Sequence, residues 1–234
     1  MNVDFPKFPE ATILSLDGLW NFKWLGDAIP EEIESITYDE KAAVPGVFDT
    51  NPLHFNQKGA GAYQKAFSVA ESGIYEFYCG GAGLVARFYI DDKLVAESCS
   101  AYTPISASLS LEAGQHRIVA VVDSRFDSQK STLFHTWADF WGHGGIYRSV
   151  TLRKLPSGGR VERVAVFTKA IETGMVEIEF ATADLPNGTY SFDIEFDGPT
   201  FGDGIAPKSY SIEIVDGKGK LELQVPDFKI WSIE

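Results

Sequence analysis

The stretch VEIEFATADLPNGTYSFDIEF, residues 176–196, alternates apolar and polar side chains on both sides of a turn-forming centre. Such alternation is typical of β-strands that have one face in a core and the other in water. The same alternation returns in Tyr210–Ile214 and Leu221–Val225, and Asn187-Gly188 and Asp216-Gly217 supply residues that tolerate positive φ in turns. This spacing of strands and turns predicts a β-sandwich in the last third of the chain.

The residues before this stretch also read as strands. Asp91-Asp92 predicts a tight hairpin turn, whereas Pro30–Ile36 is the only helical candidate. A boundary is expected near Pro156, which cannot continue a ladder and precedes Ser157-Gly158-Gly159. The chain is therefore predicted to be all-β, with one domain over residues 1–155 and a smaller one over 156–234. The strands expected in the first domain are Leu16–Trp24, Ala62–Val69, Gly73–Cys79, Leu84–Ile90, His116–Asp123 and Gly145–Leu155.

The charge balance disfavours several classes of partner. The 234 residues include 20 Lys and Arg against 33 Asp and Glu, a formal net charge of −13. Because nucleic-acid binding relies on neutralising phosphates with Lys and Arg, neither nucleic acid nor an anionic membrane is an expected partner.

The sequence shows no sign of a membrane span or of an export signal. The longest aliphatic run near the middle, Ile118–Val122, has five residues, whereas a membrane-spanning helix needs about 20. The first 16 residues lack the basic start and apolar stretch of a signal peptide. A trimmed signal would leave the same sequence, so both a cytoplasmic and an exported location stay open. Cys79 and Cys99 lack metal-ligand spacing, and both are expected to be buried thiols.

The segment TWADFWGHGGIYRSVTL, residues 136–152, is the densest candidate site. Its glycines let the backbone approach a ligand, its aromatic rings offer flat faces to sugar C–H groups, and Asp139 can accept hydroxyl protons. This mixture suits carbohydrate binding. A glycine-rich loop with aromatics packed beneath it and Asp139 capping a turn is the competing interpretation.

Other chemistries find little support. His135, Asp139 and His143 are spaced four apart, as metal ligands on a helix would be, but the surrounding glycines and aromatics disfavour a helix. No metal site and no cofactor are therefore expected. No Ser, Cys or His arrangement suggests a nucleophilic triad, and no catalytic pair stands out among the 33 carboxylates.

Six short motifs follow one another in an order that can be compared with known families. They are LDGLWNF at Leu16–Phe22, VPGVF at Val44–Phe48, AYQKAF at Ala62–Phe67, FYIDDKLV at Phe88–Val95, AYTPI at Ala101–Ile105 and DFWGHGGIYRSV at Asp139–Val150. In content and order they resemble the N-terminal part of glycoside hydrolase family 2, and especially its β-glucuronidases. The last motif is the most specific of the six.

The resemblance implies a fold for each domain. Residues 1–155 resemble the family's sugar-binding jelly-roll domain, and residues 156–234 resemble its immunoglobulin-like domain. Ile230-Trp231-Ser232 is similar to the end of that second domain, after which a catalytic (β/α)8 barrel is expected. A barrel needs about 250 residues, so the catalytic acid and nucleophile are expected to lie outside this chain.

The resemblance also implies a site. The family's aspartate before the G-I-x-R strand contacts the sugar, and Asp139 matches it by position; Trp141 and His143 are its expected neighbours in substrate binding. Arg148 is expected to pair locally or to brace a domain interface. The implied ligand is a β-glucuronide or a β-galactoside, although departures at Ile105, Ser108 and Gly142-His143 bear on the choice of sugar.

Three functions remain open at this point. The chain can be the non-catalytic N-terminal portion of a retaining β-glycosidase, inactive alone. It can be a free-standing, lectin-like carbohydrate-binding protein, since jelly rolls are common in lectins. It can also be a ligand-free adhesive or scaffolding pair of β-domains, which burial of Trp137, Phe140 and Trp141 would favour.

Overall fold

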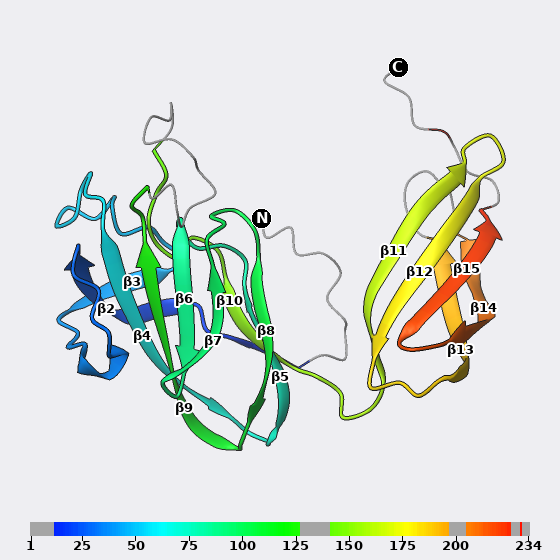
Figure 1. The fold of residues 1–234 in the computed structure, drawn as a ribbon, viewed down its shortest axis with the longest axis horizontal. Helices are drawn as coiled ribbons and strands as arrows, with labels where there is room; N and C mark the ends of the chain where they lie inside the picture. The colour runs from blue at the N-terminus through cyan, green and yellow to red at the C-terminus, as the bar shows by residue number, and fades with distance from the viewer. Residues whose placement is uncertain (1–11, 127–140, 197–204, 226–229, 231–234) are drawn as a thin grey trace. The chain divides into compact units, whose positions relative to one another are not determined.

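A computed structural model of the chain describes residues 12–126, 141–196, 205–225 and 230 (Figure 1). The chain divides into two compact units, Met1–Leu155 and Pro156–Glu234. Strands dominate both units in the part of the chain that the structure describes, so the all-β fold class is confirmed. No helix among these residues is long and apolar enough to cross a membrane.

Unit 1 is a jelly-roll sandwich of two antiparallel sheets, coloured from blue to green in Figure 1. One sheet has the strand order β1-β10-β5-β8, and the other has the order β3-β2-β4-β9-β6-β7. The strands are β1 (Ile13–Ser15), β2 (Gly18–Gly26), β3 (Glu40–Val44), β4 (Ala60–Val69), β5 (Gly73–Cys79), β6 (Val85–Ile90), β7 (Lys93–Ser98), β8 (Ile105–Leu111), β9 (Gly114–Asp123) and β10 (Val150–Lys154).

The main core of unit 1 lies between these sheets. Trp20 and Phe22 of β2 are each 1% exposed and belong to this core, with Trp24 packed against it, so the apolar face expected for β2 is confirmed. The Trp20 indole Nε1 donates a 2.8 Å hydrogen bond to the Leu16 carbonyl, which satisfies its polar atom inside the core. Burial of this aromatic face holds β2 against the main core, between β3 and β4 of its sheet.

Residues 118–122 of strand β9 are buried on both faces of the sheet. Ile118, Ala120 and Val122 point into the main core, whereas Val119 and Val121 lie in a second apolar cluster on the outer side of the sheet. The connection from β2 to β3 contributes to that cluster through Ile33. This connection contains the short 3-10 helix η1 (Ile33–Ser35), which is all that the described residues keep of the helix expected at Pro30–Ile36.

The hairpin between β6 and β7 turns at Asp91-Asp92, as predicted. Both residues have positive φ, 47° and 64°, which matches the backbone of a tight hairpin turn. The Asp91 carboxylate pairs at 2.6 Å with Nδ1 of His116 on β9. Burial alone would lower the pKa of His116, but its bonds to Asp91 and to the Glu112 carbonyl outweigh this and raise the pKa. Burial raises the pKa of Asp91, yet bonds from His116 and Arg117 lower it overall.

This pair predicts a pH-dependent contribution to stability. The raised His116 pKa stabilises the fold below the ordinary value of 6.5, and this contribution is lost as the pH rises through the folded pKa. The lowered Asp91 pKa stabilises above 3.8 and is lost as the pH falls. Asp91→Asn should therefore lower the free energy of unfolding most between pH 3.8 and pH 6.5. The loss should be at most about 1 kcal/mol, because the pair is partly exposed.

Urea unfolding of both proteins across the pH range checks this expectation. Asp92→Asn is a matched control, because Asp92 pairs with Arg117, which keeps its charge throughout. A cost of Asp91→Asn that stays constant above pH 6.5 would contradict the prediction.

Unit 2 is the second, immunoglobulin-like sandwich. Its core contains alternating apolar residues of the stretch 176–196, including Ile178, Phe180 and Phe192. These pack with Ile212 and Leu223. The sheets have the orders β11-β12-β15 and β13-β14. The strands are β11 (Arg160–Ala170), β12 (Met175–Ala183), β13 (Gly188–Phe196), β14 (Ile205–Ile214) and β15 (Lys218–Gln224).

Two turn predictions in unit 2 have different outcomes. Asp216 and Gly217 have φ of 50° and 73°, so the expected positive-φ turn is confirmed. Between β12 and β13 the left-handed residue is Asp184, with φ of 55°, and not Asn187-Gly188. Asn187 instead uses its side-chain oxygen to accept the backbone N–H of Asp216, so it links two turns.

The cysteine prediction is half correct. Cys79 is buried at the end of β5, and this burial raises the pKa of its thiol to about 12. Cys99 is exposed, because it follows β7 in the connection that leaves the sheet.

Candidate functional site

The glycine-rich loop before β10 lies between two other loops of unit 1. On one side, the N–H groups of Gly46 and Phe48 donate to the carbonyls of Ile146 (2.7 Å) and Gly144 (2.9 Å). On the other side, the N–H of Gly83 donates to the carbonyl of Gly145 at 2.7 Å. The VPGVF motif and the GHGGI part of the last motif, far apart in sequence, are therefore bonded to each other.

Glycine at position 145 is required for this packing. Its φ is +134°, and a Cβ there would lie 2.5 Å from the Gly46 carbonyl oxygen. The glycines thus permit a close approach of loop to loop, and a contact of this backbone with a ligand stays a prediction. The described part of this loop, residues 141–149, is consequently held against two other loops and is called the platform.

The carboxylate of Asp49 contacts three residues of this platform. The Asp49 side chain is fully buried, its carboxylate accepts a hydrogen bond from Trp141 Nε1 at 2.6 Å, and its other oxygen lies 3.0 Å from His143 Nδ1. A longer bond of 3.4 Å comes from the backbone N–H of Gly144. An ionised carboxylate is an acceptor only, so it suits three donors. One buried acid therefore connects the two described side chains expected to bind substrate.

The ammonium group of Lys58 places a positive charge near the carboxylate of Asp49. This ammonium lies 4.2 Å from the centre of the Trp141 ring and donates to the Gly142 carbonyl. Burial lowers the pKa of Lys58, and the negative charge of Asp49 opposes this effect. A cation over an indole face is an attractive arrangement that resists rotation of the ring.

Trp141 and His143 are anchored yet accessible. The Trp141 residue is 42% exposed, and the His143 side chain is 50% exposed. Each directs one ring nitrogen to Asp49 and leaves a large part of its side chain in solvent. Asp139 and His135 lie outside the described residues, as do Trp137 and Phe140. The exposure of Trp141 argues against the ligand-free interpretation at that position.

Sequence reasoning missed Asp49, which is one of 33 acidic residues in the chain. The available signal was its place directly after VPGVF, a motif that turns out to contact the loop. Of the two roles expected for Arg148, the structure shows local pairing. Its Nη1 donates to the carbonyls of Gly80 and Tyr102, both at 3.1 Å.

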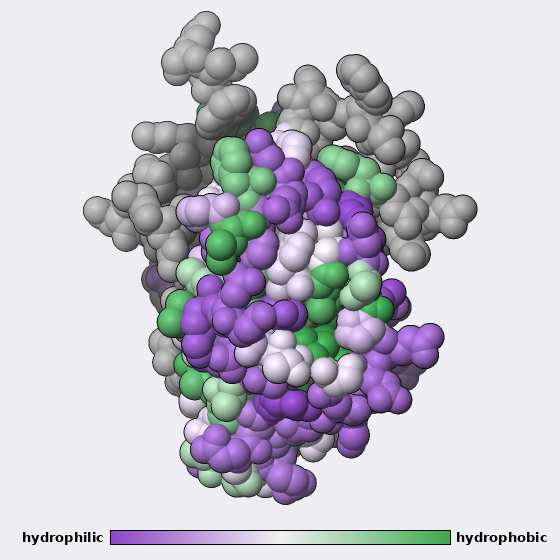
Figure 2. All heavy atoms as spheres, turned by 90° about the vertical axis from the view of Figure 1, so that its left-hand side faces the viewer, coloured by the Kyte–Doolittle hydropathy of each residue, from purple (hydrophilic) through white to green (hydrophobic). Residues whose placement is uncertain are grey.

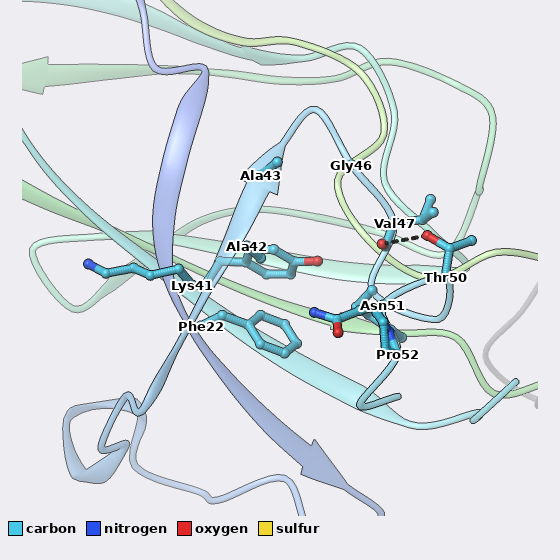
Figure 3. Close-up of a pocket in the computed structure, with 11 residues that line it drawn as sticks. Phe22, Lys41, Ala42, Ala43, Gly46, Val47, Thr50, Asn51 and Pro52 are labelled. Atoms are coloured by element: carbon cyan, nitrogen blue, oxygen red, sulfur yellow. Dashed lines mark hydrogen bonds between the residues drawn. The ribbon is translucent and has the colours of Figure 1, made fainter. Parts of the chain in front are cut away.

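A cavity of about 340 Å³ opens between β3 and the segment 46–52 (Figure 3). The buried rings of Phe22, Phe48 and Tyr63 contribute to its lining, and Thr50 and Asn51 add polar groups. In Figure 3 the Lys41 amine points away from the Phe22 ring. Figure 2 shows apolar residues gathered among polar ones on the side of unit 1 that carries β2 and β3. Phe48, which lines this cavity, also donates its N–H to the Gly144 carbonyl of the platform.

No group of three or more His, Cys, Asp or Glu side chains that could hold a metal ion is found in residues 12–126, 141–196, 205–225 and 230. The described chemistry of the site is that of hydrogen-bonding side chains beside an aromatic face. Such a combination is suited to a hydroxylated ligand.

Comparison with known proteins identifies the family. Residues 13–156 match the family described as glycosyl hydrolases family 2, sugar binding domain. The chain belongs to glycosyl hydrolase family 2. Its residues 13–156 are the sugar-binding domain of this family, and the family expected from the six motifs is thereby confirmed. No curated protein matches the family 2 chain.

Solved structures share the fold of this family 2 chain. A β-galacturonidase from Eisenbergiella tayi, bound to galacturonate, is 22% identical with a TM-score of 0.73, covering 97% of this chain and 40% of its own. A Bifidobacterium dentium β-glucuronidase complexed with coumarin-3-O-glucuronide is 19% identical with a TM-score of 0.77, covering 97% and 44%. A β-D-mannosidase from Dictyoglomus thermophilum is 15% identical with a TM-score of 0.66, covering 91% and 31%. The chain thus spans less than half the length of each of these relatives.

Proposed function

We propose that the chain is the non-catalytic N-terminal portion of a retaining β-glycosidase that acts on a β-glucuronide or a β-galactoside. It comprises a sugar-binding domain, residues 1–155, and an immunoglobulin-like domain, residues 156–234. The membership in family 2 and the names of the structural relatives, which include a β-glucuronidase and a β-galacturonidase, support this proposal. The catalytic carboxylates, about 5 Å apart in a retaining enzyme, come from a barrel outside these residues.

The anchored, exposed Trp141 ring is the observation that carries the sugar-binding part of the proposal. Its apolar face can pack against the C–H groups of a sugar, while its N–H is already satisfied by Asp49. His143 offers a ring nitrogen to a hydroxyl group. Asp139, outside the described residues, completes the set as an acceptor of a hydroxyl proton.

Trp141→Ala in the full-length enzyme is expected to lower kcat/KM for a p-nitrophenyl β-glycoside roughly tenfold, which corresponds to about 1.4 kcal/mol of lost contact energy. Tyr102→Ala is a matched control, because Tyr102 is an exposed aromatic residue of the same unit. Equal kinetics for wild type and Trp141→Ala would remove Trp141 from the substrate site. The 234-residue chain alone is expected to hydrolyse neither the glucuronide nor the galactoside.

A lectin-like function is the second candidate. Trp141 is exposed in the chain by itself, so a sugar could bind without a barrel. Titration of the 234-residue chain with glucuronate and galactose tests this alternative. Saturable binding that Trp141→Ala abolishes would favour a free-standing binding protein. Binding that appears only in the full-length enzyme would favour the glycosidase portion.

A further inference from the structure

The neutral ring of His143 carries one N–H proton, which can lie on either ring nitrogen. The carboxylate of Asp49 decides between them. Trp141 Nε1–H and the Gly144 N–H are donors only, and both bond to Asp49 Oδ2. The other oxygen, Oδ1, lies 3.0 Å from His143 Nδ1. Since an ionised carboxylate can only accept, the proton must sit on Nδ1 of the neutral ring.

We propose that Asp49 is the positioning residue of the sugar-contacting platform: its buried carboxylate holds the Trp141 ring in place and fixes neutral His143 with the proton on Nδ1, leaving Nε2 as an acceptor for a sugar hydroxyl. This inference rests on the proposed function for its sugar. The geometry that carries it is the buried carboxylate with bonds to Trp141, His143 and Gly144.

The arrangement has a chemical consequence for recognition. A sugar hydroxyl that meets an unprotonated Nε2 donates its hydrogen to this nitrogen. Nε2 therefore favours a ligand with a hydrogen-bond donor at that place. If the proton were on Nε2, the same hydroxyl would have to accept. Asp49 thus sets the hydrogen-bonding polarity of a side chain that touches the ligand, without touching the ligand itself.

Asp49→Asn provides a sharp test, because asparagine keeps the shape of the side chain and changes one oxygen into a donor. The remaining oxygen can still accept from Trp141 Nε1, whereas the new NH₂ group faces His143 Nδ1. Nδ1 must then become the acceptor, and the ring proton moves to Nε2. The substitution is expected to move the ring proton of His143 from Nδ1 to Nε2 while it leaves the fold intact.

Long-range proton–nitrogen NMR of the 234-residue chain at about pH 8, above the ordinary histidine pKa of about 6.5, measures this directly. The His143 signals are assigned by their loss in His143→Gln. Wild type should show a protonated Nδ1 and an unprotonated Nε2, and Asp49→Asn should show the reverse. Asp17→Asn is the matched control, because Asp17 accepts the backbone N–H of Val150; it should leave His143 unchanged.

The wild-type spectrum alone can overturn the inference, so it does not depend on folding of the variant. A protonated Nε2 in the wild type, or the same His143 pattern in wild type and Asp49→Asn, would show that Asp49 does not set the tautomer. The sugar titration is a separate measurement. Absence of any sugar effect on Trp141 and His143 in the full-length enzyme would refute the proposed function, whatever the tautomer.

Discussion

Trp20→Ala should destabilise unit 1 by about 3–5 kcal/mol, the usual cost of truncating a buried tryptophan. Trp20 is 1% exposed in the main core, and its removal leaves both a large cavity and an unsatisfied Leu16 carbonyl. Because small domains are stable by only about 5–15 kcal/mol, the variant should be close to unfolding. Urea titration followed by the amide resonances of unit 1 measures the change.

The neighbouring residue is a matched control for this substitution. Leu19 lies on the same strand and is 65% exposed. Leu19→Ala should therefore change the free energy of unfolding by no more than about 0.5 kcal/mol. Trp20→Phe separates the two contributions, because it retains most of the ring and loses only the bond to Leu16. Similar costs for the two alanine variants would show that the core is not built on Trp20.

Gly83→Ala should destabilise unit 1 by about 1–3 kcal/mol through overpacking. A Cβ at position 83 would lie 2.4 Å from the His143 carbonyl oxygen and 2.9 Å from Gly144 Cα. Both are backbone atoms of the platform, so neither can move aside as a flexible side chain would. The platform should shift, and the amide signals of Trp141 and His143 should shift with it in NMR spectra.

Gly158→Ala is the corresponding control. No heavy atom lies within 4 Å of a Cβ at position 158, so the new methyl group meets open space. This variant should be neutral or more stable by up to about 1 kcal/mol, because alanine restricts the unfolded chain. Thermal unfolding of the two variants gives the comparison. A Gly83→Ala protein as stable as Gly158→Ala would mean that the loops separate easily.

The sequence predicted strands and faces well where side chains alternate. Alternation reflects burial on one face, which is a local property, and the apolar faces of β2 and β12 follow from it directly. The expected strand at Gly145–Leu155 begins only at Val150, because the residues before it bond to two other loops instead of a neighbouring strand. Loop-to-loop bonding depends on tertiary structure, and no periodicity reports it.

The site was predicted in part. Trp141 and His143 belong to one cluster, as their proximity in sequence suggested, and their role in binding a sugar stays a prediction. The acid that organises them was missed, since Asp49 lies 92 residues from Trp141. Only the folded chain brings these residues together. A buried carboxylate has no distinctive sequence signature when 33 acidic residues are present.

The double burial of β9 has a consequence for the order in which the protein opens. Residues 118–123 pair with β4 on one edge and with β6 on the other, and apolar clusters cover both faces. Amide hydrogens in such a strand exchange with solvent only when the whole domain unfolds. β9 should therefore form the slowest-exchanging unit of the domain, and its exchange rates would report the global stability of unit 1.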